Sequence, residues 1–172
     1  MKYVPESKSI TISERGRPLG YGADGGLLTD LSKDGWEPHK FRITPRGLSI
    51  DFVFADTSAH RYEYDCNQEG GSAESFVRTL ENFGDKGWEV IFAYRVGTEG
   101  AETSGTYTRF LMRRRLDQGN SQRFKYHFVY QLPQVNKVSK PAAWKKICII
   151  PAHAGWRDDH PYVLFKEVIK EQ

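Results

Sequence analysis

The sequence predicts an α+β protein made of duplicated β-α-β-β units, with a mainly antiparallel sheet and helices packed on one of its faces. Two observations support this prediction. A leucine, an apolar residue three positions later and a Gly-Trp-Glu tripeptide four positions after that occur twice, ending at Glu37 and at Glu89. Recurrence of such a pattern indicates a repeated supersecondary unit. Around both copies, apolar and polar residues alternate over short stretches, which is typical of half-buried strands.

A single domain of 172 residues accommodates both units. We place the units at about residues 8–55 and 61–116, and we treat 117–172 as a C-terminal extension that could be a degenerate third unit. A chain of this length buries enough surface to fold without a metal or a disulfide. Its 38% hydrophobic and 27% charged residues indicate a folded globule rather than a disordered chain.

The first unit is expected to begin with a strand at 8–13 and to continue, after a glycine-rich loop, into a short helix. We expect Asp24 to cap this helix and the helix to reach Asp34. Gly35 follows the last turn, where a left-handed backbone is common and glycine adopts it without steric strain. The clearest strand of this unit covers 48–54.

The second unit is expected to start with a strand at Tyr62 and Tyr64, followed by a turn at 67–71. Ser72 is the expected N-cap of a helix that Gly87 terminates. Its apolar face contains Phe76, Leu80 and Phe83. A hairpin loop at 97–105 then separates two strands, the second at 106–116, and the inward face of the first strand is expected to consist of Val90, Phe92, Tyr94 and Val96.

The extension contains three further alternating or apolar stretches, which predict strands at 124–130, 147–150 and 162–169. Residues 140–146 are expected to form a helical turn that begins near Pro141. A third Gly-Trp pair, at Gly155 and Trp156, precedes the final strand.

The second unit contains a characteristic order of elements. A Tyr-x-Tyr strand (Tyr62-Glu63-Tyr64) comes first, then a helix with its Gly-Trp-Glu turn and the start of a strand (76–91), and finally a strand that ends in basic residues (107–116). In this order residues 61–115 resemble the small bacterial domain-of-unknown-function family 4177, and residues 8–55 resemble the same unit more loosely. The resemblance implies the β-α-β-β fold. It implies no catalytic residues, because the family has no assigned chemistry.

The net charge of +3 is unevenly distributed. Residues 109–146 contain ten lysines and arginines against one acid, whereas 61–105 contain four against nine acids. Such asymmetry can orient an anionic partner, although the two regions could also face each other in the fold.

Arginines on one face of the strand at 106–116 offer planar groups of donors that suit phosphate or carboxylate recognition. The alternative is a solvated edge strand that charge protects against aggregation. The tryptophan of the second Gly-Trp-Glu element could line a ligand cleft, or it could be purely structural. The predicted ligand-binding residues are Tyr107, Arg109, Arg113, Arg115 and Trp88.

Signatures of catalysis and of metal or cofactor binding are not found in the sequence. No histidine pairs with another histidine or a cysteine at metal-ligand spacing, and no phosphate-binding glycine loop is present. Cys66 and Cys148 are interpreted as reduced, partly buried thiols, with a disulfide between them as the alternative. We therefore predict no catalytic residue, no metal and no cofactor. A cluster of His153, Asp158, Asp159 and His160 could bind a divalent metal, but a solvated polar turn also explains it.

The predicted function is that of a non-catalytic, cytoplasmic binding module that recognises an anionic small molecule or an acidic protein surface through residues 109–146. Nucleic acid is a less supported partner, suggested by aromatic residues between the cations. No membrane partner is expected, because the longest apolar run, 147–152, is too short to cross a bilayer and the first residues do not resemble a signal peptide. Two alternatives stay open: a small enzyme acting on an anionic substrate through the C-terminal His/Asp cluster, and a structural domain that forms homo-oligomers.

Overall fold

The computed structural model describes residues 7–13, 23–44, 47–55, 61–70, 72–96, 107–117, 122–130, 140–150 and 161–169. Most of these residues are in mainly antiparallel strands, which confirms the predicted α+β class. In the described part of the chain, neither helix is long and apolar enough to span a membrane. The elements in chain order are β1 (Ser7–Ser13), α1 (Ala23–Lys33), β2 (Trp36–Thr44), β3 (Gly47–Phe54), β4 (Tyr62–Glu69), α2 (Ala73–Gly84), β5 (Glu89–Val96), β6 (Tyr107–Arg115), β7 (Arg123–Tyr130), β8 (Lys145–Ile150) and β9 (Tyr162–Ile169).

Three sheets of three strands each form the described structure, in the orders β1-β3-β2, β4-β6-β5 and β7-β9-β8. β3 is antiparallel to β1 and β2, β5 is antiparallel to β6, and β9 is antiparallel to β7 and β8. The chain also divides into two compact units, the first made of Met1–Cys66 with Arg114–Gly119 and the second of Asn67–Arg113 with Asn120–Gln172. In all three sheets, the strand that comes last in the sequence lies between the other two.

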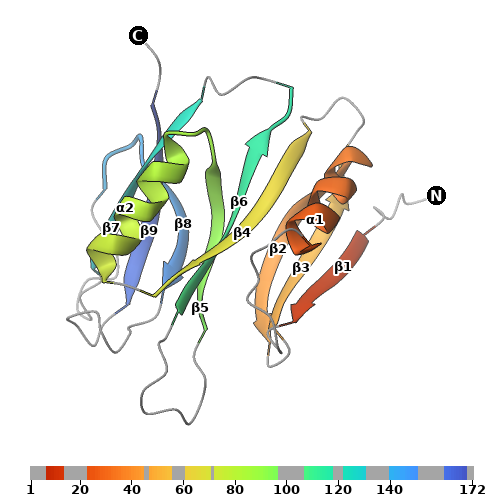
Figure 1. The fold of residues 1–172 in the computed structure, drawn as a ribbon, viewed down its shortest axis with the longest axis horizontal. Helices are drawn as coiled ribbons and strands as arrows, with labels where there is room; N and C mark the ends of the chain where they lie inside the picture. The colour runs from red at the N-terminus through yellow and green to blue at the C-terminus, as the bar shows by residue number, and fades with distance from the viewer. Residues whose placement is uncertain are drawn as a thin grey trace. The chain divides into compact units, whose positions relative to one another are not determined.

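In the first unit, α1 lies over β2 and β3 (Figure 1). The helix begins one residue before Asp24, so the expected cap residue is inside its first turn. The backbone leaves the helix at Gly35, whose φ of 88° is the left-handed conformation that glycine favours. Trp36 is buried there and packs edge-on against Phe54, with 5.5 Å between the ring centroids. The predicted helix and the left-handed glycine that follows it are therefore confirmed for this unit.

Hydroxyl groups of α1 satisfy backbone donors of β4, an edge strand of its sheet. Thr29 Oγ1 accepts a hydrogen bond from the Tyr64 N–H at 2.9 Å, and Ser32 Oγ accepts one from the Tyr62 N–H at 2.9 Å. The two hydroxyls are one helical turn apart, and the two amides are two residues apart on the strand, so their spacings match. The two hydroxyls therefore occupy N–H groups on the edge of β4. If this edge were uncovered, these N–H groups could pair with a strand of another chain.

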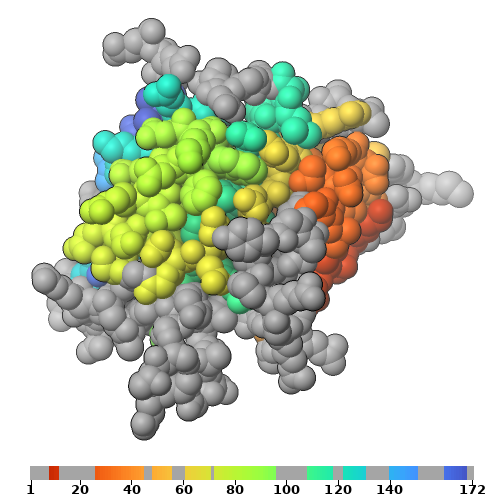
Figure 2. All heavy atoms as spheres, in the orientation of Figure 1, coloured from red at the N-terminus to blue at the C-terminus, as the bar shows by residue number. Residues whose placement is uncertain are grey.

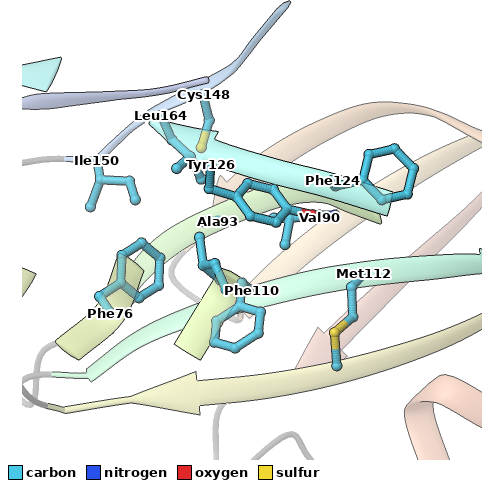
Figure 3. Packing of buried hydrophobic residues seen from close by; sticks show 11 residues of the cluster. Phe76, Val90, Ala93, Phe110, Met112, Phe124, Tyr126, Cys148, Ile150 and Leu164 are labelled. Carbon is cyan, nitrogen blue, oxygen red and sulfur yellow. Dashed lines mark hydrogen bonds between the residues drawn. The ribbon is translucent and has the colours of Figure 1, made fainter. Parts of the chain in front are cut away.

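In the second unit, α2 packs against β7 and β5 (Figure 1). It forms a broad part of the visible surface (Figure 2). Ser72 caps the helix as predicted, since its hydroxyl accepts a hydrogen bond from the Ser75 N–H at 3.2 Å. The helix approaches β7 so closely at Gly84 that an added Cβ would lie 2.1 Å from the Phe124 carbonyl oxygen. Beneath α2 is a core cluster, drawn in Figure 3, of Phe76, Leu80, Val90, Ala93, Phe110, Met112, Phe124, Tyr126, Cys148, Ile150 and Leu164.

The hydroxyl of Tyr126 links β7 to the start of β5 (Figure 3). It donates a hydrogen bond to the Trp88 carbonyl at 2.9 Å and accepts one from the Val90 N–H at 2.8 Å. Burial raises the pKa of this hydroxyl, so it keeps the proton that it donates. The turn after Gly87, which has a φ of 81°, is thus fixed from the neighbouring sheet.

Two predictions for the second unit are wrong. Residues 67–69 belong to β4 rather than to a turn, because pairing within the sheet overrides their turn-forming composition. The pairing of β5 with β6 shifts in register between Val90 and Phe92, so alternation is interrupted there. Val90 lies opposite Met112 in the core, whereas Tyr94 lies opposite Arg109, so these two residues of β5 do not share a face.

Candidate anion-binding site

The arginines of the predicted site all lie on β6, where alternation puts Arg109 and Arg113 on the face away from Phe110 and Met112. Arg115 ends the strand and belongs to the first unit, whereas Arg109 and Arg113 belong to the second. Tyr107 pairs with Val96 at the start of β6, and its side chain lies outside the described residues. Trp88 is half-buried and packs against the core cluster.

Arg113 is engaged by Glu89, the acidic residue of the second Gly-Trp-Glu element. The Arg113 Nε lies 2.6 Å from Glu89 Oε2, and the Lys166 ammonium donates to Glu89 Oε1. Burial alone would raise the pKa of Glu89, but the two cations and their hydrogen bonds hold it below its usual 4.5. The carboxylate therefore joins β5, β6 and β9. Its partners could not be identified from the sequence, because Lys166 is far away along the chain.

The next two arginines of β6 also have carboxylate partners. The Arg114 Nε lies 2.6 Å from Glu63 Oε1, and the Arg115 Nε lies 3.2 Å from Asp117 Oδ1. These ion pairs, both within the first unit, neutralise cations of the basic segment that was predicted to form a binding surface. A row of three available guanidinium groups on β6 is therefore not formed.

Arg109 differs from the other arginines of β6. Its side chain is only 7% exposed, and among the described residues no acceptor bonds its Nε or Nη1. A buried polar group without a partner is unusual in folded proteins and requires an explanation. Among the predicted site residues, Arg109 is therefore the one whose Nε and Nη1 donate no hydrogen bond to a described residue.

The remaining described cations of the basic segment gather on the sheet β7-β9-β8. Phe124 and Tyr126 of β7 belong to the core cluster, so alternation directs Arg123 and Lys125 to the opposite face. Lys146 lies opposite Phe165 in register, and the Lys140 ammonium is 5.9 Å from the centre of the Phe165 ring. We call the exposed set of Arg123, Lys125, Lys140, Lys146 and Ile149 the basic face.

An aromatic stack supports the basic face. The rings of His127 and Trp144 are parallel within 9°, with centroids 3.7 Å apart, and His127 Nε2 lies 2.9 Å from Glu167 Oε2. Trp144 also contacts Phe165 at 5.9 Å between centroids. Trp144 N donates to the Pro141 carbonyl at 3.0 Å, so the expected helical turn shrinks to a single turn before β8 begins at Lys145. That turn places Trp144 over the sheet.

Features associated with catalysis are few in the described residues. No group of three or more His, Cys, Asp or Glu side chains there could hold a metal ion. The cluster of His153, Asp158, Asp159 and His160 lies outside the described residues. Cys66 and Cys148 are buried and form no disulfide. Burial raises the pKa of Cys148 to about 12, so this thiol is protonated and unreactive at neutral pH.

Comparison of the chain with models of known families, with curated proteins and with solved structures finds no match. The resemblance of residues 61–115 to family 4177 therefore stays a prediction.

Proposed function

We propose that this chain is a non-catalytic binding module that recognises an acidic protein surface through its basic face. The observation that supports this proposal is the difference between two groups of cations. Arg113, Arg114 and Arg115 are held by carboxylates of the same chain. The four cations of the basic face are exposed, and no carboxylate of a described residue lies within ion-pair distance of any of them.

The surroundings of these cations favour protein over nucleic acid as the partner. Ile149 is 46% exposed on the same face, opposite Val163 in register. Protein interfaces combine an apolar centre with a charged rim, whereas a surface for a phosphate backbone is dominated by cations. Trp144 already stacks on His127, so one face of its ring is not available for a base.

The test is the affinity for a labelled polyglutamate peptide, measured by fluorescence anisotropy over a range of salt concentrations. Lys125→Gln combined with Lys146→Gln removes two exposed contacts worth about 0.4–2 kcal/mol together, so affinity should fall roughly 2- to 30-fold. The matched control is Arg78→Gln combined with Lys86→Gln, which removes two exposed charges of the same unit away from the basic face. Equal losses in both double variants would indicate a general charge effect and refute the proposal. Tighter binding of a DNA duplex than of polyglutamate would indicate that the partner is nucleic acid and not an acidic protein.

We also infer that residues 8–55 and 61–116 derive from one duplicated β-α-β-β unit within a single domain. The shared order of elements, the central third strand and the positive-φ glycine before Trp36 and Trp88 support this inference. Residues 117–172 have the same strand order in β7-β9-β8 without a helix among their described residues, which is the expectation for a degenerate third unit.

A further inference from the structure

The guanidinium of Arg109 lies inside the second unit without a counter-ion among the described residues. A buried guanidinium remains positively charged, so its burial has to be compensated by an anion or by hydrogen-bond acceptors. An unpaired charge in a site of low polarity is strongly disfavoured, and the donors on its nitrogens lose hydrogen bonds that water would supply. None of the described residues supplies the anion that such a position requires.

The two acidic residues that β4 and β5 contribute to the second unit are committed to other partners. Glu89 is bound by Arg113 and Lys166. Glu69, near the end of β4, accepts hydrogen bonds from Ser75 Oγ at 3.2 Å and Thr79 Oγ1 at 3.0 Å, so it faces α2. None of the described carboxylates is bonded to Arg109 Nε or Nη1.

A second buried polar group lies on the same side of the sheet β4-β6-β5. Because Glu69 faces α2, strand alternation directs its neighbour Gln68 to the opposite face, which is the face of Arg109. Gln68 Oε1 is also buried and has no hydrogen-bond partner among the described residues. Tyr94 lies opposite Arg109 in register and shares this face. The Leu116 N–H donates to the Arg61 carbonyl at 2.9 Å, so the start of β4 lies beside the end of β6 and the end of β4 beside the start of β6. An amide from β4, a cation from β6 and a phenol from β5 therefore lie at one end of the sheet.

We propose that Arg109 anchors a buried site for the carboxylate or phosphate group of a small molecule, and that Gln68 Oε1 accepts a hydrogen bond from a hydroxyl or N–H group of the same molecule. A side chain that is 7% exposed cannot meet the surface of a macromolecule, so the ligand is small or enters by a terminal group. Guanidinium N–H groups match the oxygens of both anions, and the hydrogen bonds are charge-assisted. This site is separate from the basic face and does not depend on the proposed function.

The experiment is a thermal-unfolding titration of the full chain after dialysis into chloride buffer. Sodium phosphate and sodium succinate are added separately up to about 20 mM at constant ionic strength, so that general screening does not change. A saturable rise in Tm with one anion is expected, because a ligand that binds only the folded state stabilises it by mass action. The anion that raises the Tm shows whether the site prefers a phosphate or a carboxylate group. If neither anion raises the Tm of the wild-type chain, the proposal is refuted.

Variants of Arg109 separate a specific site from a general salt effect. Arg109→Gln should weaken the responding anion at least about 30-fold, which is the lower range for removing one partner of a buried charge pair. Its anion-free Tm should exceed that of the anion-free wild type, because the unpaired charge is gone. Arg109→Lys keeps the charge and serves as a second variant, with weaker but saturable binding expected.

Two controls complete the test. Arg78→Gln removes an exposed charge from α2 and should leave the anion response unchanged. Lys86→Gln removes an exposed charge that follows α2 and should also respond like the wild type. An equal anion response in wild type and Arg109→Gln, or an anion-free Arg109→Gln less stable than the anion-free wild type, would overturn the assignment.

Discussion

Removal of one hydroxyl, by Tyr126→Phe, is expected to lower the free energy of unfolding by about 2–4 kcal/mol. The hydroxyl bonds the Val90 N–H at 2.8 Å and the Trp88 carbonyl at 2.9 Å. Val90 is fully buried, so its N–H would be left without an acceptor, at a cost of about 1–3 kcal/mol. The Trp88 carbonyl would lose a further bond worth about 0.5–1.5 kcal/mol, while the phenyl ring would keep its packing.

The measurement is urea unfolding followed by circular dichroism. With a slope of about 2 kcal/mol per molar urea, the transition midpoint should fall by about 1–2 M at an unchanged slope. The matched control is Tyr130→Phe on the same strand, where the half-buried side chain can exchange a lost bond for water, so a smaller change is expected. A loss below about 0.5 kcal/mol for Tyr126→Phe, or one equal to the control, would refute the assigned role of the hydroxyl.

Three further substitutions are expected to have measurable effects. Glu89→Gln should reduce the free energy of unfolding by about 3 kcal/mol at neutral pH, because it leaves two cations without their carboxylate. Since the folded pKa of Glu89 lies below 4.5, the stability it supplies is present above that pH and is lost as the pH falls through the folded value, so wild type and variant should converge in acid. Gly84→Ala should destabilise by about 3 kcal/mol, because its Cβ would lie 2.1 Å from a carbonyl oxygen of β7, whereas Gly26→Ala, which meets nothing within 4 Å in α1, should stabilise by about 0.5–1 kcal/mol. Ser32→Ala should cost about 1 kcal/mol and accelerate hydrogen exchange of the Tyr62 amide.

Specific results would contradict each of these expectations. A stability difference between wild type and Glu89→Gln that is constant with pH would exclude the carboxylate as the titrating group. Equal changes in the free energy of unfolding for Gly84→Ala and Gly26→Ala would mean that the close approach of α2 to β7 does not cause the loss of stability in Gly84→Ala. Unchanged exchange at Tyr62 in Ser32→Ala would show that another acceptor protects that amide.

Local signals in the sequence predicted much of the fold. The final strand has the predicted bounds, 162–169, and the helix after Ser72 begins where its cap residue indicated. These features depend on neighbours within a few positions, such as the alternation along one strand or a hydroxyl three residues from an amide. The bulge near Ile91 has no comparable signal, because it depends on how β5 pairs with β6.

The candidate site was less accessible to sequence reasoning, since ion pairs depend on tertiary contacts. Arg109, Arg113 and Arg115 look equivalent in the sequence, all on one side of a basic strand. Only the fold shows that Glu89 and Asp117 engage the last two, whereas Arg109 is buried without such a partner among the described residues. The charge counts along the sequence identified the basic segment 109–146. They could not distinguish cations that are neutralised by carboxylates of the same chain from cations that can bind a partner.

The strand order β7-β9-β8 has a consequence for the growing chain. A ribosome delivers both flanking strands first, yet they do not pair with each other, so each waits for Tyr162–Ile169 to emerge and be inserted between them. Until then the aromatic residues of β7 and the apolar residues of β8 have no partner in their own sheet. A deletion that removes β9 therefore takes away the middle of the sheet, and the backbone edges of β7 and β8 that β9 covers become open to other chains.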